Sequence, residues 1–196
     1  MKVGEVSGEF DLESMKTRLI HKMPEPEIGD LPVAAVAVIV DPSSKGRAIL
    51  LIRRTERGDD PWSGQIAFPG GRKSFADKDL LETAIREAME EVGVQLRDHE
   101  HLGNLAIVTT RTRRMRVLPI IFQLKSEISI HANTEVTETF WAPLGVLEKL
   151  EVRNREVKTE SGVLNVPSYE YEGHLIWGLT FRILNLLLNR NVPGDQ

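Results

Sequence analysis

Apolar residues between positions 81 and 92 recur with the spacing of one face of a helix. They stand at i, i+3, i+4, i+7 and i+11, as Leu81, Ala84, Ile85, Ala88 and Val92. This single stripe at a period of 3.6 residues predicts an amphipathic helix. Asp77 or Asp79 can cap its start, and Gly93 can supply the left-handed residue that follows its end.

Shorter apolar runs predict strands elsewhere in the chain. Val33–Val40 and Ala48–Arg53 are continuous apolar runs joined by the turn sequence DPSSKG, which predicts a hairpin of two strands buried on both faces. Further strands are predicted at Gln65–Phe68, His101–Thr110, Met115–Leu124, Ile128–Ile130 and Thr139–Trp141. A second hairpin is predicted around the turn Glu160-Ser161-Gly162.

Three more stretches predict helices, at Phe10–Met23, Leu144–Leu150 and Leu175–Leu188. The last is apolar on much of its surface, so it should pack against the core or against a partner chain. Strands mixed with helices in this order predict an α/β protein, an α/β/α sandwich with a mixed β-sheet. We expect residues 1–32 to form an N-terminal helix and connector, 33–190 the main domain, and 191–196 a tail.

The composition narrows the class of protein. Of the 196 residues, 41% are hydrophobic and 28% are charged, with a net charge of −4 and no cysteine. These values are typical of a globular protein without disulfides or zinc–thiolate sites, and they give no general attraction to nucleic acid or anionic membranes. The apolar runs are too short to span a bilayer, and the N-terminus lacks the core of a signal peptide. We therefore expect a cytoplasmic protein that binds neither nucleic acid nor membrane.

The polar face of the helix at 81–92 carries charges that a helix alone disfavours. Glu87 stands three and four residues before Glu90 and Glu91, and like charges at these spacings repel by about 0.2–0.5 kcal/mol per pair. Glu90 and Glu91 also lie in the last turn, where the helix dipole disfavours anions. A hard divalent cation would offset more of this repulsion than nearby basic side chains, because it takes oxygen ligands and suits clustered carboxylates.

The segment Arg86–Val94, REAMEEVGV, resembles the second half of the Nudix box, with a small alanine at its first aliphatic position. The first half departs from the family's pattern. The position of its first glutamate falls on Lys78, and Gly71 stands one residue early. A one-residue insertion in the loop explains both departures and leaves Asp77 or Asp79 to replace the missing glutamate.

Other segments resemble one branch of the Nudix hydrolases, the coenzyme A diphosphatases. They are Phe68-Pro69-Gly70-Gly71 ahead of the lengthened box, Ile49–Arg54 upstream of it, and Ile176–Thr180 near the end of the chain. The branch's upstream histidine is absent from the span Arg57–Gly64, which is also one residue longer. The resemblance extends over residues 33 to 188 and is strongest from 47 to 94.

The resemblance implies hydrolysis of the diphosphate linkage of coenzyme A or its derivatives. It implies Mg²⁺ or Mn²⁺ held by Glu87, Glu90, Glu91 and the backbone carbonyl of Gly71. These three glutamates are catalytic candidates together with Glu138, while Glu135 competes with Glu138 for the role of a general base in the same loop.

Further roles follow from the same resemblance and from position. Arg53, Arg54 and Gln65 are candidates for substrate contacts, whereas Arg86, Gly70 and Gly93 are expected to be structural. Trp141 and Trp177 are expected in the core. The arginines of segment 111–116 are expected to form a charged turn, and the alternative is a contact to the 3′-phosphate of coenzyme A.

Other functions fit the same residues. A close variant takes ADP-ribose, another nucleotide sugar or a dinucleotide as the nucleoside diphosphate derivative. A non-catalytic nucleotide-binding module is an alternative of another class, and the intact segment Arg86–Gly93 argues against it. A protein-interaction domain that uses the helix at 175–188 is a third class, although the same helix can serve the homodimer that the resemblance implies.

Overall fold

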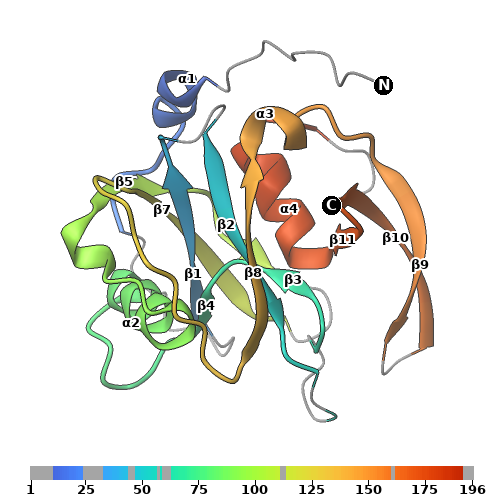
Figure 1. Cartoon of the computed structure of the whole chain (residues 1–196), viewed down its shortest axis with the longest axis horizontal. Helices are drawn as coiled ribbons and strands as arrows, with labels where there is room; N and C mark the ends of the chain where they lie inside the picture. Colours follow the sequence, from blue (N-terminus) through green and yellow to red (C-terminus); the bar gives the residue numbers. More distant parts are fainter. Residues whose placement is uncertain are drawn as a thin grey trace.

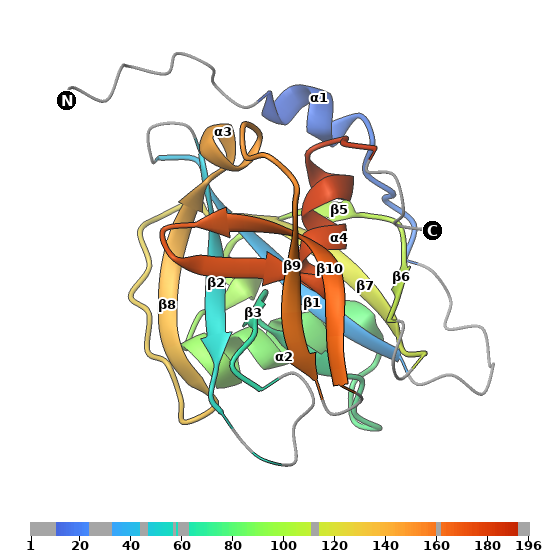
Figure 2. The ribbon, with the colours of Figure 1, turned by 90° about the vertical axis from the view of Figure 1, so that its right-hand side faces the viewer.

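The computed structural model describes residues 11–23, 33–43, 47–56, 58, 63–110, 114–159 and 162–191, whose strands form two sheets (Figures 1 and 2). The larger sheet contains β1 (Val33–Asp41), β2 (Ala48–Arg54), β3 (Ile66–Ala67), β4 (Gly70–Arg72), β5 (Glu100–Asn104), β6 (Val108–Thr109), β7 (Arg116–Gln123) and β8 (Val136–Pro143). The smaller contains β9 (Arg153–Thr159), β10 (Gly162–Tyr171) and β11 (His174–Trp177). The helices are α1 (Leu12–Lys16), α2 (Leu80–Val92), the 3₁₀ turn η1 (Leu96–Asp98), α3 (Leu144–Leu147) and α4 (Gly178–Leu187).

The larger sheet is mixed, as the sequence predicts. Its strands follow the order β3-β2-β1-β7-β5, with β4 beside β1, β6 beside β7 and β8 beside β2. β1 and β7 run parallel, whereas β1 with β2 and β2 with β8 run antiparallel. Helix α2 covers one face and α4 the other (Figure 1). The predicted α/β/α sandwich is therefore confirmed.

Strand β1 is buried on both faces, which explains its uninterrupted apolar sequence. Ala35, Ala37 and Ile39 pack into the cluster that contains the apolar face of α2. The alternate residues Val36 and Val38 pack into the cluster beneath α4. Because successive side chains of a strand point to opposite faces, a central strand covered by helices on both sides must be apolar at every position.

The expected helix at 175–188 is wrong at its start. Leu175 to Trp177 belong to β11, which pairs antiparallel with β10 around a tight turn at Glu172 and Gly173. Both turn residues have positive φ, 48° and 81°, as the favoured two-residue hairpin turns require. The helix begins only at Gly178, and its apolar side chains Phe181, Ile183, Leu184 and Leu187 pack in the core. The choice between core and partner chain therefore falls on the core for this face.

Other boundaries also shift. The expected strand at 101–110 is split into β5 and β6. The strand expected at 139–141 is longer and forms β8, and Gly70–Arg72 forms β4, which was not expected. Ile128 and Ile130 form no strand and instead pack partly buried against the α2 cluster. Within the described part of the expected helix at 10–23, only Leu12–Lys16 is helical. Phe10, the connector 24–32 and the turn residues Glu160 and Ser161 lie outside the described residues.

The N-terminal helix α1 packs into the core of the main body. Leu12, Met15 and Leu19 belong to the same buried cluster as α4. Both terminal nitrogens of the Arg18 guanidinium donate to the last carbonyls of α4, those of Leu186 and Leu187, at 3.2 Å. A cation at this position satisfies carbonyls that the helix leaves without partners. None of the described helices, α1 to α4, is long and apolar enough to cross a membrane.

Truncating the buried side chain of α1 should destabilise the whole domain. Met15 is fully buried, so Met15→Ala should lower the free energy of unfolding by about 2–5 kcal/mol through lost burial and a cavity. Urea unfolding followed by circular dichroism measures this. Met89→Ala is the matched control: Met89 is 49% exposed, and its truncation should change stability by less than about 0.5 kcal/mol. If Met15→Ala lowered the free energy of unfolding no more than Met89→Ala does, α1 would be an independent arm that does not stabilise the core.

Candidate active site

Helix α2 is defined at both ends by the residues that its sequence offers. The Asp79 side chain caps the N-terminus by accepting from the Glu82 N–H at 2.9 Å. Gly93 follows the last turn with a φ of 71°, a left-handed conformation that glycine adopts without a steric penalty. The apolar stripe is buried as expected, except that Leu80 takes the deeply buried position and Leu81 is only partly buried.

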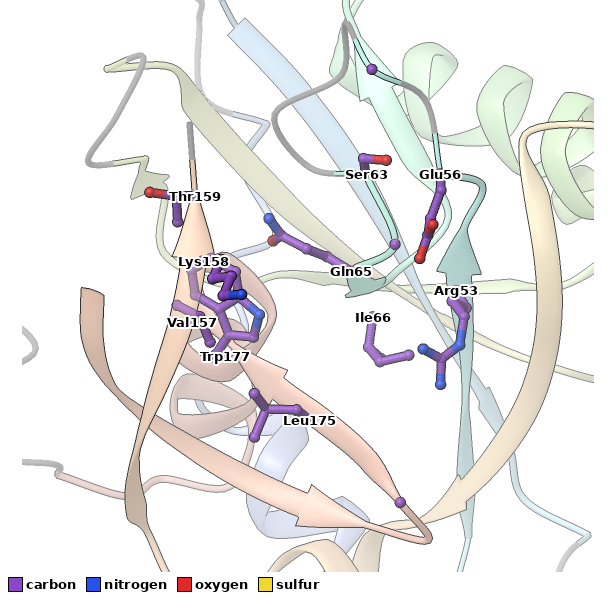
Figure 3. A pocket seen from close by; sticks show the side chains of 13 residues that line it. Arg53, Glu56, Ser63, Gln65, Ile66, Val157, Lys158, Thr159, Leu175 and Trp177 are labelled. Atoms are coloured by element: carbon purple, nitrogen blue, oxygen red, sulfur yellow. The ribbon is translucent and has the colours of Figure 1, made fainter. Parts of the chain in front are cut away.

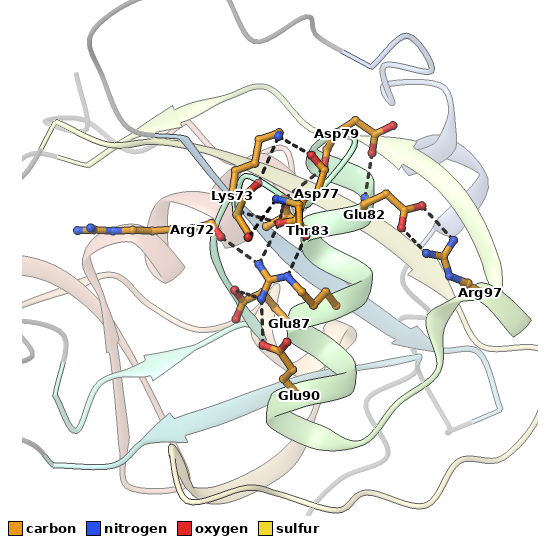
Figure 4. A network of polar contacts seen from close by, with 12 residues as sticks. Arg72, Lys73, Asp77, Asp79, Glu82, Thr83, Glu87, Glu90 and Arg97 are labelled. Atoms are coloured by element: carbon orange, nitrogen blue, oxygen red, sulfur yellow. Dashed lines mark hydrogen bonds and ion pairs between the residues drawn. The ribbon is translucent and has the colours of Figure 1, made fainter.

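Arg86 is held by Asp77, the other of the two candidate aspartates. Its Nε and Nη2 donate to the two carboxylate oxygens of Asp77 at 2.9 and 3.0 Å, and Nη2 also donates to the Arg72 carbonyl at 3.1 Å (Figure 4). The hydrogen bonds from Arg86 lower the pKa of Asp77 to about 2. Asp77 is 7% exposed, and such a two-pronged pair fixes the guanidinium plane. The two aspartates thus have different tasks, one capping α2 and one anchoring Arg86.

Arg86 in turn contacts two of the three glutamates. Its Nη1 lies 2.9 Å from Glu87 Oε1 and 2.9 Å from Glu90 Oε2. The Glu90 side chain is 54% exposed, which places it at the rim of the site. One guanidinium therefore partly neutralises the acidic face. The structural role expected of Arg86 stays a prediction, which these contacts support.

Glu91 is the most deeply buried acid of the cluster. It is 2% exposed, its Oε2 accepts from the Gly70 N–H at 2.8 Å, and its Oε1 lies 3.3 Å from Arg54 Nη1. Burial raises the pKa of Glu91 to about 7 in spite of these two donors. Arg54, expected to contact substrate, is thus placed where it positions a helix carboxylate.

Glu87 lies directly against the second glycine of the Phe-Pro-Gly-Gly segment. A Cβ added to Gly71 would stand 2.5 Å from the Glu87 carboxylate carbon, so a larger residue would push this carboxylate out of its position. Burial raises the pKa of Glu87, and Arg86 opposes the shift. The nearby charge of Glu135 also contributes to raising the pKa of both Glu87 and Glu91. Of the two loop candidates, Glu135 is therefore the one whose charge reaches the helix carboxylates.

Glu138 is engaged elsewhere. Its Oε2 accepts from Arg53 Nε at 3.0 Å, and its Oε1 lies 3.6 Å from His174 Nε2. Arg53 Nη2 lies 2.8 Å from His174 Nδ1, and the imidazole stacks on Phe140 with ring centroids 4.1 Å apart. This network joins β2 and β8 to β11 of the smaller sheet. The sequence carried no signal for His174, because its partners come from distant segments.

The donor set fits a hard divalent cation. Within the described residues, no three acidic or histidine side chains stand close enough together to hold a metal ion as they are. Glu87 and Glu91 are nevertheless one helical turn apart and desolvated. Burial raises the pKa of both, the charge of Glu90 adds to the shift of Glu87, and the charge of Glu87 adds to that of Glu91. A cation bound to oxygen ligands relieves both penalties once the carboxyls have lost their protons.

The remaining substrate candidates line a separate hollow. Arg53 and Gln65 lie on a cavity of about 530 Å³ between the edge of the larger sheet and the smaller sheet (Figure 3). Trp177, expected in the core, also lines this cavity, whereas Trp141 packs partly buried against the α2 cluster. Of the arginines at 111–116, Arg111 and Arg113 lie outside the described residues and Arg114 is exposed.

Comparisons with known proteins give the class. The model of the NUDIX domain family matches residues 30–161. A Nudix hydrolase of Photorhabdus laumondii, NudL, is 35% identical over 153 residues, or 77% of this chain and 81% of its own. Human mitochondrial coenzyme A diphosphatase NUDT8 is 28% identical over 83% of this chain and 71% of its own. A Caenorhabditis elegans Ap4A hydrolase has a similar fold, with a TM-score of 0.50 and 19% identity over 57% of this chain and 80% of its own.

The fold and the acidic helix thus define a hydrolase of phosphorus anhydrides. The chain belongs to the NUDIX family and is a pyrophosphohydrolase. Enzymes of this family generally use divalent metal ions such as Mg²⁺ or Mn²⁺.

Removing the charge of Asp77 should destabilise the protein in a pH-dependent way. Because the folded pKa lies below the unfolded value of 3.8, the stabilisation is present above pH 3.8 and is lost as the pH falls through 2. Asp77→Asn should therefore cost about 2 kcal/mol at pH 7 and about half as much at pH 3, as measured by urea unfolding at both pH values.

Asp79→Asn is the control for this substitution. Asparagine caps a helix about as well as aspartate, so the cost at pH 7 should stay below about 0.5 kcal/mol. A loss at Asp77 that is independent of pH would mean that packing, and not the ion pair with Arg86, accounts for its effect.

Proposed function

We propose that this enzyme hydrolyses the diphosphate linkage of coenzyme A or its derivatives with the help of Mg²⁺ or Mn²⁺. The observation that carries the proposal is the pair Glu87 and Glu91, held against Gly71 and Gly70 of the Phe-Pro-Gly-Gly segment. The similarity to a human coenzyme A diphosphatase over 83% of the chain supports this choice of substrate.

The charge balance of the site explains why a metal ion is needed. A diphosphate substrate and the carboxylates of Glu87 and Glu91 are all anionic, so they repel one another unless cations lie between them. Glu87 and Glu91 would hold the ion, with the Gly71 carbonyl as a further oxygen ligand and Glu90 at the rim. When bound, the ion supplies neutralisation of the phosphate oxygens and a lowered pKa of a coordinated water.

The protein's own groups then have separate tasks. Arg86, anchored by Asp77, orients Glu87 and Glu90. Arg54 and the Gly70 N–H orient Glu91. Glu135 is the general base that accepts the proton of the attacking water. Its carbonyl accepts from the N–H of Thr55, the residue after the Arg54 that contacts Glu91, and its charge acts on both Glu87 and Glu91. Glu138, the other candidate, is bound to Arg53.

Substitution of the helix glutamates tests the reaction. Glu87→Gln and Glu91→Gln should each lower kcat/KM by at least about 100-fold, because an outer-shell residue of a metal site already costs 10–100-fold. The substrates are coenzyme A, ADP-ribose and a diadenosine polyphosphate with Mg²⁺ or Mn²⁺, and mass spectrometry identifies the products. Coenzyme A should give 4′-phosphopantetheine and adenosine 3′,5′-bisphosphate.

The control is Glu100→Gln, an exposed position at the start of β5, which should keep full activity. Cleavage of ADP-ribose to AMP and ribose 5-phosphate in preference to coenzyme A would replace the proposed substrate. Full activity of both Glu87→Gln and Glu91→Gln would refute the metal site itself.

A second comparison identifies the base. Glu135→Gln should lower kcat by about 100-fold or more, as loss of a general base does. Glu138→Gln should lower kcat far less, since its carboxylate contacts Arg53 and His174. A larger loss of kcat in Glu138→Gln than in Glu135→Gln would reverse the assignment.

A further inference from the structure

The cavity between the two sheets is built from two segments that the chain brings together. Residues 63–66 and Arg53, at the edge of the larger sheet, form one side, while Lys158 of β9 and Leu175 and Trp177 of β11 form the other (Figure 3). Leu175 and Trp177 lie beyond residues 30–161, the part that matches the family model. The segment that follows the matched part therefore supplies part of one wall of the cavity.

The cavity has an apolar wall and a set of groups that can form hydrogen bonds. Leu175 and the indole of Trp177 are partly exposed and offer apolar surface on the side of β11, next to the largely buried Val157 of β9. Gln65 and Glu56 line the other side. A side-chain amide can both donate to and accept from a purine edge, and a carboxylate can accept from an exocyclic amino group. This combination suits a planar aminated base, stacked on one face and recognised at its edge.

The charges of the cavity distinguish its two cationic side chains. Arg53 is neutralised by Glu138 at 3.0 Å and contacts His174. Lys158 is exposed, and within the described part of the chain no carboxylate forms an ion pair with its ammonium. An ammonium beside a stacking surface attracts an anionic substituent of the bound base or its sugar, and a phosphate group is the strongest such anion.

The cavity adjoins the acidic helix closely enough for one substrate to reach both. Arg53 lines the cavity, while the next residue, Arg54, contacts Glu91. Ile66 lines the cavity four residues before Gly70, whose N–H binds Glu91, and four residues span at most about 14 Å. A nucleotide whose diphosphate meets Glu87 and Glu91 can therefore place its base in the cavity.

We propose that this cavity binds the phosphorylated adenosine end of the substrate, with the base on Trp177 and the 3′-phosphate at Lys158. The proposal rests on the proposed function, because only a coenzyme A-type substrate brings a 3′-phosphate to this place. Lys158, Gln65 and Trp177 are then specificity-determining residues of the site, and the smaller sheet is the element that selects the nucleotide.

Binding of the nucleotide product tests the cavity without any hydrolysis. Isothermal titration calorimetry in EDTA should give the wild-type protein a Kd about two- to fivefold tighter for adenosine 3′,5′-bisphosphate than for AMP, the effect of one exposed ammonium–phosphate contact. Lys158→Ala should remove this preference by weakening the binding of the bisphosphate and leaving the Kd of AMP unchanged. Lys149→Ala, an exposed lysine that does not line the cavity, should preserve it.

The stacking surface is tested in the same assay. Trp177→Leu should weaken both nucleotides by about five- to fiftyfold, as loss of one base–aromatic stack does, and Trp177→Phe should restore part of the affinity. The proposal is overturned if the preference for the bisphosphate survives Lys158→Ala, or if Trp177→Leu leaves both Kd values unchanged. Should Trp177→Leu fail to fold, Trp177→Phe and Lys158→Ala decide.

Hydrolysis separates this inference from the proposed function. With Mg²⁺, Lys158→Ala should lower kcat/KM for coenzyme A by about two- to fivefold and leave that for 3′-dephospho-coenzyme A unchanged. If the nucleotides bind as expected but neither compound is cleaved, the proposed function is wrong and the cavity assignment holds. If coenzyme A is cleaved but binding is indifferent to Lys158 and Trp177, the cavity assignment is wrong and the proposed function holds.

Discussion

Burial of the Glu91 carboxylate is the constraint on which the site depends. An ionised carboxyl inside a protein costs several kcal/mol unless it is paired or hydrogen-bonded. Here the compensation comes from the Gly70 N–H and from Arg54. The Glu91 carboxylate therefore joins three elements: the last turn of α2, the start of β4 and the end of β2. A shift of any one of the three would expose the charge or leave it unpaired. The precision of the acidic cluster follows from this penalty.

The parts that the sequence predicted are those controlled by local patterns. The stripe from Leu81 to Val92 and the cap at Gly93 define α2, because helical period and left-handed glycine are properties of neighbouring residues. The proximity of Glu87 and Glu91 follows from their spacing of four. The uninterrupted apolar run of β1 correctly indicated a strand covered on both faces. The mixed sandwich could be inferred from these few elements.

The parts that could not be predicted depend on contacts between distant segments. Asp77 and Asp79 are equivalent in the sequence, and only the path of the loop assigns one to Arg86 and the other to the helix cap. Leu175 and Ile176 suit a helix or a strand, and pairing with β10 decides for the strand. Lys158 was not singled out in the sequence and Trp177 was expected in the core, because their common cavity exists only once the two sheets have met.

The loop before α2 has a consequence for how such enzymes are found. Two hydrogen bonds close the turn that holds Asp77 in place. The Ser74 N–H donates to the Asp77 carboxylate at 2.8 Å, and the Lys73 ammonium donates to the Asp77 backbone carbonyl at 2.5 Å. This turn presents two oxygens to Arg86 in a loop whose spacing departs from the family's pattern. A search with a fixed string of letters would discard the chain as a broken motif. A three-dimensional template of one guanidinium and the two oxygens that face it would recognise it, whatever the length of the intervening loop.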